Sequence, residues 1–267
     1  MADGTGEAPA LLREDAGGVA TLTLNRPAQL NALSEALLAA LQAEFDALAV
    51  DAATKVVVIR SAGRAFCAGH DLREMERARA APDRGRAYFT SLFAQCARMM
   101  TSITRLPQPV IAEVHALATA AGCQLVASCD MAVASREAKF GVNGVNIGLF
   151  CSTPMVALTR NIPAKHAFEM LTTGGFIDAE RAERLGLVNR VAAPEDLAQE
   201  TRALAETVAG KLASAVRIGK RAFYEQAEMS LDAAYAHTGR VMAENMLHRD
   251  TAEGVAAFLE KRRPDWS

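Results

Sequence analysis

The first sixty residues alternate between segments with strand-like and helix-like spacing of apolar side chains. Residues 19–24 (VATLTL) alternate apolar and smaller or polar positions, which predicts a strand with one buried face. Ser34 then offers a helix N-cap, and the leucines and phenylalanine of residues 37–48 recur at helical spacing. Residues 55–61 (KVVVIRS) form a β-branched run, a pattern typical of a strand covered on both faces.

The same alternation continues to about residue 191 and then stops. In order, we expect strand 110–115, a helix of small residues at 119–128, strand 131–134, loop 140–154, helix 178–185 and strand 187–191. From Pro194 onward the apolar spacing is helical almost throughout. Strands that alternate with helices predict an α/β fold. We expect a core over residues 1–194 and a helical region over residues 195–267.

Composition narrows the functional classes. The chain has 267 residues, a formal net charge of −2 and 51% hydrophobic residues, of which few are aromatic. This charge does not favour nucleic acid as a partner. The long uncharged stretch between Glu113 and Asp130 is rich in small residues, which argues against a membrane span.

The five cysteines show neither a disulfide framework nor the spacing of a metal site. This favours a reduced, intracellular protein. The acidic start of the chain resembles neither a secretory signal nor a transit peptide. We therefore expect a cytoplasmic protein without a bound metal.

An arginine-rich segment covers residues 73–86. Asp71 followed by Glu74 has the spacing of a helix capping box, so a helix is expected to begin there. The arginines that follow are balanced in part by acidic residues, and the favoured interpretation is a solvated, partly mobile surface segment. Attraction of an anionic ligand is the alternative, and binding of RNA is a distant one.

Two segments of small residues, one just before a predicted helix and one at the opening of another, favour backbone contact with a ligand. One is Cys67-Ala68-Gly69 and the other is Ala120-Ala121-Gly122. Free N–H groups at a helix start attract negative charge, and two such donors on one oxygen would form an oxyanion hole. Small residues at a helix start also simply permit close packing, which is the better interpretation on spacing alone.

Several separated motifs together resemble the crotonase (enoyl-CoA hydratase/isomerase) superfamily. They are LNRPAQLNAL (24–33), FCAGHDL (66–72), VIAEVHALATAAGCQLVASCD (110–130), AKFGVNGVNIGLFCSTP (138–154), LTTGGFIDAERAERLGLVNRV (171–191) and FLEKRRPDW (258–266). The motifs follow the family's order over essentially the whole chain. They are most similar to a subgroup named enoyl-CoA hydratase domain-containing proteins.

The resemblance implies a ββα spiral core and an acyl-CoA thioester as substrate, with no other cofactor. The backbone N–H groups of Ala68 and Ala121 match the family's oxyanion hole, which stabilises a thioester enolate. Arg26 and Ala28 match positions near the pantetheine and phosphates, and Lys261 resembles a basic contact to CoA that often comes from a neighbouring subunit. The loop after Ala68, including Asp71 and Leu72, matches the region that lines the adenine end of CoA. The other predicted substrate-binding positions are Cys67, Gly69, His70, Gly122, Asn143 and Cys151.

The chain departs from the family at its two catalytic glutamates, which match Gln124 and Gly144. An amide does not titrate and glycine has no side chain, so the paired-acid hydration mechanism does not operate as it does in the family. General acid–base catalysis is worth ~10²–10⁴ in rate. His70 is a titratable substitute, although we favour a helix-entry role that points away from the acyl pocket. Cys151 is more readily explained as a small packing group.

Two functions of different class follow. The first is an acyl-CoA enzyme of hydratase or isomerase type with other proton carriers. The second is a non-catalytic acyl-CoA-binding or assembly protein of fatty-acid metabolism. The resemblance also implies that the C-terminal helices associate in a homotrimer or a dimer of trimers.

Overall fold

The chain builds a six-stranded sheet in which most neighbours run parallel. The computed structural model describes residues 8–266. Strand order in the larger sheet is β1-β2-β3-β5-β7-β10, with β1 antiparallel to β2 and the remaining neighbours parallel. The strands are β1 (Leu11–Ala16), β2 (Val19–Leu24), β3 (Val56–Ser61), β5 (Val110–Val114), β7 (Met131–Ser135) and β10 (Arg190–Ala192).

The chain also forms a second, four-stranded sheet of order β4-β6-β8-β9. Its strands are β4 (Ala65–Cys67), β6 (Leu117–Thr119), β8 (Lys139–Gly141) and β9 (Phe176–Asp178). Strands β4, β6 and β8 directly follow β3, β5 and β7, so each turn of the chain adds one strand to each sheet before a helix begins. This repeat is the ββα spiral that the family resemblance implies. A bulge interrupts the pairing of β4 with β6 between Ala65 and Cys67.

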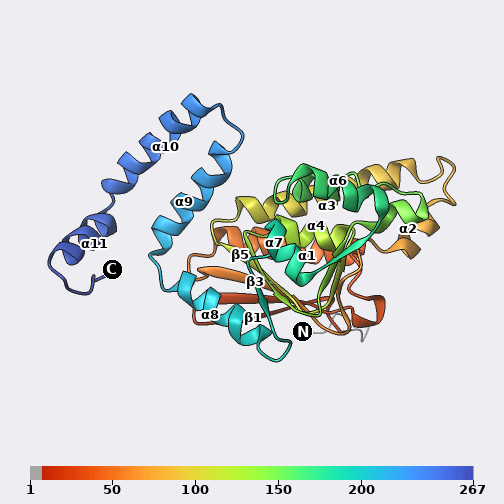
Figure 1. Ribbon diagram of the computed structural model, residues 1–267, viewed down its shortest axis with the longest axis horizontal. Coiled ribbons are helices and arrows are strands. Elements are labelled where there is room, and N and C mark those ends of the chain that lie inside the picture. The colour runs from red at the N-terminus through yellow and green to blue at the C-terminus, as the bar shows by residue number, and fades with distance from the viewer. Residues whose placement is uncertain (1–7, 267) are drawn as a thin grey trace.

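Helices cover the two sheets (Figure 1). Helix α1 (Glu35–Val50) packs against α3 (Arg86–Arg105), and the side chains between them and the sheets form the main core. Ser34 caps α1, because its hydroxyl accepts the Leu37 N–H at 3.2 Å. The other core segments are η1 (Pro27–Gln29), α2 (Leu72–Ala78), α4 (Ala121–Ser128), η2 (Asn143–Ile147), α5 (Pro154–Leu158), α6 (Ala164–Thr173) and α7 (Ala179–Leu185).

Helix α8 (Leu197–Ala209) covers the other face of the larger sheet. Its Leu197 and Leu204 bury against Val58, Ile111 and Val133 in a second apolar cluster. The β-branched run of β3 is buried from Val56 to Ile59, which confirms a strand covered on both faces. The predicted division between residues 194 and 195 falls just before α8, which packs on the core.

The last three helices extend away from the core (Figure 1). They are α9 (Ala213–Gln226), α10 (Leu231–Met246) and α11 (Arg249–Leu259). Large apolar side chains on α10 and α11 are exposed: Leu231, Tyr235, Met242, Met246, Val255, Phe258 and Leu259. Within residues 8–266, no helix is both long and apolar enough to cross a membrane.

Several local predictions differ from the structure. Helix α3 fills residues 86–105, where no element was predicted, and α2 makes the first part of the arginine-rich segment helical. Helix α4 begins two residues later than expected, since Thr119 ends β6, and β10 begins later than the strand expected at 187. The capping box is wrong in its second half. Asp71 accepts the Arg73 N–H at 3.1 Å, but the Glu74 carboxylate accepts the N–H of Glu35 at 3.0 Å and so links α2 to α1.

Candidate active site

The two segments of small residues meet in the folded chain. Gly69 has φ of +91°, and a Cβ added there would lie 2.9 Å from the Ala120 Cβ and 3.4 Å from the Ala121 nitrogen. On the other side, a Cβ added to Gly122 would overlap the carbonyl oxygen of Cys67. Because glycine stands at both contacts, the junction of β4 with α2 lies directly against the junction of β6 with α4.

The backbone amides at these junctions divide into engaged and free groups. The Ala68 N–H donates to the Leu30 carbonyl at 3.1 Å, so it is not available to a ligand. His70 lies opposite Leu33 in an isolated bridge whose bonds use the Gly69 carbonyl and the Asp71 N–H. Within residues 8–266, the N–H groups of His70 and Ala121 donate to no backbone or side-chain acceptor.

The backbone pairing of Ala68 contradicts one donor of the expected pair. Ala68 was matched to the oxyanion hole, but its N–H serves the turn that holds residues 30–33. The His70 N–H, directly after this segment and two residues beyond Ala68, is free within the described residues. Ala121 keeps its expected place as the first residue of α4, where the backbone N–H has no acceptor within the helix. Ala120 precedes it with φ of 50°, a positive value that is rare for a residue with a side chain.

The His70 side chain is largely buried and lacks a partner. Its ring meets Phe93 of α3 edge to face, with centroids 5.5 Å apart. Within the described chain, neither ring nitrogen makes a hydrogen bond. Burial lowers the pKa of His70, although the nearby Leu33 carbonyl opposes this effect in part. The imidazole is therefore neutral at pH 7.

Gln124 lies on α4 one turn after Ala121. Its side chain is buried, and its Oε1 atom accepts no hydrogen bond from the residues that the structure describes. Its backbone N–H donates to Ala120 at 3.0 Å, and its carbonyl accepts the Ser128 hydroxyl at 2.8 Å. The backbone of Gln124 is thus fixed, while the amide oxygen of its side chain is free to accept a donor.

Gly144 stands where the backbone leaves no room for a side chain. A Cβ there would overlap the Leu149 carbonyl oxygen and would lie 2.9 Å from the Cys151 sulfur. The Leu149 N–H also donates to the Gly144 carbonyl at 3.0 Å, which closes this loop on itself. Burial raises the pKa of the Cys151 thiol, and the Gly144 N–H opposes this only in part. Cys151 is accordingly a neutral thiol that fills space beside Gly144.

Asn143 connects the loop to the site strand. Its side-chain oxygen accepts the Thr119 hydroxyl at 2.6 Å, which links η2 to the end of β6. Cys67 and Cys123 are fully buried, and burial raises the pKa of each thiol to about 12. These thiols are protonated at pH 7, so they do not act as nucleophiles there.

Arg26 and Asp71 are brought together although 45 residues separate them. The Arg26 guanidinium donates to the Ala32 carbonyl at 3.0 Å and lies 3.4 Å from the Asp71 carboxylate. Asp71 also caps α2, so this pair ties the turn after β2 to the helix that follows His70. Ala28, two residues after Arg26, and Leu72, directly after Asp71, are both exposed to solvent.

Lys261 lies far along the chain from this site. Helix α11 ends at Leu259, so Lys261 belongs to the turn after it, with φ of 56°. The helices that carry it project from the core (Figure 1). The structure therefore does not bring Lys261 to the residues around Gly69 within one chain.

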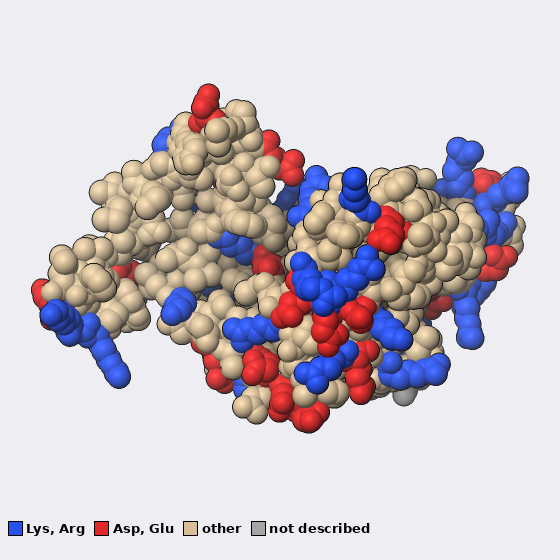
Figure 2. Space-filling view, in the orientation of Figure 1, with Lys and Arg blue, Asp and Glu red and all other residues tan. Residues whose placement is uncertain are grey.

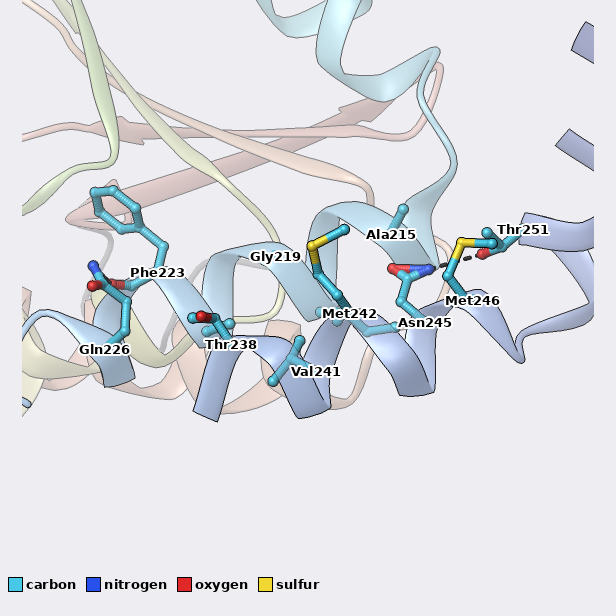
Figure 3. Close-up of a pocket in the computed structure, with 12 residues that line it drawn as sticks. Ala215, Gly219, Phe223, Gln226, Thr238, Val241, Met242, Asn245, Met246 and Thr251 are labelled. Atoms are coloured by element: carbon cyan, nitrogen blue, oxygen red, sulfur yellow. Dashed lines mark hydrogen bonds between the residues drawn. The ribbon is translucent and has the colours of Figure 1, made fainter. Parts of the chain in front are cut away.

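An apolar hollow of about 470 Å³ lies among the projecting helices (Figure 3). Helices α9 and α10 form its walls, and Thr251 of α11 closes one end through a hydrogen bond from Asn245 of 2.8 Å. Its remaining lining residues are Ala215, Ile218, Gly219, Ala222, Phe223, Gln226, Thr238, Val241, Met242 and Met246. None of these residues belongs to the junction around Gly69, so the hollow is separate from the candidate active site.

Comparison with known proteins identifies the family. Residues 14–267 match the family model described as enoyl-CoA hydratase/isomerase. The chain belongs to the enoyl-CoA hydratase/isomerase family. A rat relative, "Enoyl-CoA hydratase domain-containing protein 3, mitochondrial", is 44% identical over 94% of this chain and 82% of its own. A "Probable enoyl-CoA hydratase" of Rhizobium meliloti is 33% identical over 96% of this chain and 97% of its own.

Solved structures of the family agree. An enoyl-CoA hydratase of Mycobacterium smegmatis has a TM-score of 0.93 and 56% identity, and covers 97% of this chain and 99% of its own. Human enoyl-CoA hydratase domain-containing protein 3 has a TM-score of 0.92 and 42% identity, and covers 96% of this chain and 100% of its own. The predicted superfamily, its domain-containing subgroup and the α/β spiral fold are confirmed.

The same comparison contradicts the cytoplasmic prediction. The rat, Xenopus laevis, human, mouse and zebrafish relatives, each 43–44% identical, are all named mitochondrial. The prediction relied on the acidic start of the chain, and residues 1–7 lie outside the described residues. Cellular location is read by targeting machinery and is not fixed by the composition of the folded domain.

Proposed function

We propose that this family member binds an acyl-CoA thioester and stabilises its enolate, with the backbone amides of His70 and Ala121 as oxyanion donors. The observation that carries the proposal is the pair of free N–H groups on two junctions that touch at Gly69. An enolate concentrates negative charge on the former carbonyl oxygen. Preorganised donors aimed at that oxygen are commonly the largest single contribution to such catalysis.

The reaction we propose is of hydratase or isomerase type, without the family's pair of glutamates. Gln124 matches the first glutamate position, and its unpartnered Oε1 atom suits a hydrogen bond from a water or from a substrate hydroxyl. Gly144 matches the second, and its packing against Leu149 supports a site that has no carboxylate there. His70 places a neutral imidazole at the junction, and we propose it as the proton carrier to be tested.

Exchange of α-hydrogens tests enolate formation without assuming the later reaction. The protein is incubated with butyryl-CoA in D2O, and the mass gain at the α carbon is followed alongside hydration of crotonyl-CoA. We expect exchange above the rate without protein. Ala121→Pro should abolish it, because proline removes the donor while position 121 is the first residue of the helix, where proline is well tolerated. Ala121→Gly keeps the N–H and should retain exchange.

His70→Gln separates the two roles of residue 70. The variant keeps the backbone N–H but has no titratable ring, so a loss of exchange with unchanged binding of butyryl-CoA assigns proton transfer to the imidazole. Retained exchange leaves His70 with the oxyanion role alone. An absence of exchange and of hydration in the unmodified protein would overturn the catalytic proposal.

A second candidate function is acyl-CoA binding without turnover. The crowded Gly144 and the non-titrating Gln124 favour it. Calorimetric titration with butyryl-CoA separates the two functions, because tight binding without exchange supports the binder. Absence of binding would contradict both.

We also propose that the chain forms a homotrimer or a dimer of trimers through α9, α10 and α11. The exposed apolar side chains of α10 and α11 and the apolar hollow beside them support association, since exposed patches of this kind mark contact surfaces. Light scattering at micromolar concentration should give the mass of three or six chains, and the mass of a single chain would contradict the proposal.

A further inference from the structure

A second hollow, of about 490 Å³, lies where the end of α2 meets the start of α3. Figure 2 shows blue side chains gathered at this end of the molecule. Two partly buried phenylalanines line it, and the three arginines that line it are exposed and form what we call its rim. The lining residues are Arg79, Asp83, Arg84, Arg86, Phe89, Thr90 and Phe93. We call it the arginine pocket.

Most of the negative charge near the arginine pocket is already engaged. The Asp83 carboxylate accepts the N–H groups of Gly85 at 3.0 Å and Ala87 at 2.8 Å, at the start of α3. Arg79 pairs with Glu76 at 3.1 Å and lies over the Phe89 ring at 5.6 Å. Within residues 8–266, Arg84 and Arg86 make no ion pair. Two guanidinium groups on the rim are thus available to an anion.

The backbone holds Arg84 at the rim in an uncommon conformation. Arg84 has φ of 59°, and Gly85 follows with φ of 84°. A Cβ added to Gly85 would lie 2.9 Å from the Phe89 ring and 3.0 Å from the Ala78 carbonyl, so the turn packs closely on both helices. Strain of this kind persists only where the surrounding structure fixes it, and it is concentrated at binding sites.

Phe93 connects the arginine pocket to the candidate active site. It lines the pocket, and its ring also contacts the His70 ring at a centroid distance of 5.5 Å. One phenyl ring therefore separates the pocket from the residue whose amide we assign to the thioester oxygen. In an acyl-CoA, the extended pantetheine arm separates the phosphates from the thioester, whereas the acyl chain begins at the thioester. An anion beside Phe93 therefore belongs to the acyl chain.

We infer that the arginine pocket recognises a carboxylate at the far end of the acyl group, so that the ligands of this protein are acyl-CoA monothioesters of dicarboxylic acids. This inference rests on the proposed function of the site at His70 and Ala121. The Phe89 and Phe93 rings contact the methylene chain, and Arg84 and Arg86 bind the terminal carboxylate. Guanidinium groups bind carboxylates through paired, charge-assisted hydrogen bonds.

Two series of saturated CoA thioesters, matched in chain length, test the inference by calorimetry. One series is butyryl-, hexanoyl- and octanoyl-CoA, and the other is succinyl-, adipoyl- and suberoyl-CoA. All share the same CoA, so a preference reports the terminal carboxylate alone. We expect at least one dicarboxylic thioester to bind about tenfold more tightly than its matched partner, as one charge-assisted contact provides. This preference should fall as ionic strength rises.

The double variant Arg84→Gln, Arg86→Gln should lose the preference and bind butyryl-CoA as the unmodified protein does. Arg98→Gln is the matched control, since Arg98 is exposed on the same helix and does not line the pocket. Equal affinity for both series in the unmodified protein overturns the inference and leaves the proposed function intact. If the double variant binds butyryl-CoA and free CoA more weakly by the same factor, the arginines bind the CoA phosphates. That result also overturns the inference and leaves the proposed function intact. Absence of binding by every thioester overturns the inference together with the proposed function.

Discussion

Lys220 of α9 places its ammonium group 2.6 Å from the carboxylate of Asp130, which lies between α4 and β7. The same ammonium donates to the Ile103 and Gln108 carbonyls at 2.8 Å each, and Tyr224 donates its hydroxyl to Asp130 at 2.7 Å. Burial lowers the pKa of Lys220, and the Asp130 carboxylate opposes that change. This buried network fastens the projecting helices to the core.

Removal of one partner from this network should destabilise the fold strongly. Lys220→Met leaves the Asp130 charge and two carbonyls without their donor, and breaking a buried pair costs about 3–5 kcal/mol. The free energy of unfolding in urea measures the loss. Lys165→Met, at an exposed lysine, is the control and should change stability by less than about 0.5 kcal/mol. Equal stability of the two variants would show that the network contributes nothing.

His70 should make stability dependent on pH in the acidic range. Burial lowers its pKa in the folded state, so the unfolded chain, with a pKa of about 6.5, binds the proton more readily. Lowering the pH below about 6.5 therefore favours unfolding, at up to about 1.4 kcal/mol per pH unit until the folded-state pKa is reached. Denaturation at pH 7.5 and pH 5 should show a smaller loss for His70→Gln than for the unmodified protein. An identical pH dependence of both would contradict this.

Glutamate should not be tolerated at position 144. Even the Cβ of alanine would overlap the Leu149 carbonyl, and overpacking typically costs about 1–3 kcal/mol. We expect Gly144→Ala and Gly144→Glu both to lower the melting temperature. The double variant Gln124→Glu, Gly144→Glu should not gain hydration of crotonyl-CoA. A double variant that folds normally and hydrates crotonyl-CoA rapidly would show that this loop adapts.

Gly122→Ala should separate the two junctions of the candidate site. The new methyl group would overlap the Cys67 carbonyl, so we expect lower stability and loss of α-hydrogen exchange. Gly239→Ala is the matched change in α10, where a Cβ meets nothing within 4 Å. It should stabilise the chain by about 0.4–1 kcal/mol, because alanine restricts the unfolded state. Thermal unfolding of both variants gives the comparison.

The hydrophobic pattern was sufficient to predict several helices and strands in which the spacing of buried side chains is regular. Strand β2 has the predicted bounds, and Ser34 caps α1 as expected. The smaller sheet was missed because β4, β6, β8 and β9 have three residues each, too few for a period to be recognised. Helix α3 was not assigned, although its buried face is regular from Leu92 to Ile103.

The candidate site was predictable in place but not in atomic detail. The small residues around Gly69 and Gly122 indicated where two junctions would meet. Which N–H groups remain free depends on long-range pairing, since Ala68 is engaged by Leu30, 38 residues earlier in the chain. The partner of a backbone amide in another loop cannot be read from residue types. Residue types likewise do not show that Arg84, just before α3, and Phe93, within α3, line the same hollow.

The bulge between β4 and β6 determines which residues of these two strands, and of the segments after them, lie opposite each other. Pairing begins with Ala65 opposite Leu117, and an unbroken ladder would set Cys67 opposite Thr119. The bulge instead sets Cys67 opposite Ala118. Three residues beyond Cys67 and Ala118, past the ends of β4 and β6, lie His70 and Ala121, whose backbone amides we propose as oxyanion donors. Phe66, left unpaired by the bulge, thus shifts the register of β4 against β6 by one residue, and this shift sets His70 level with Ala121 at the site.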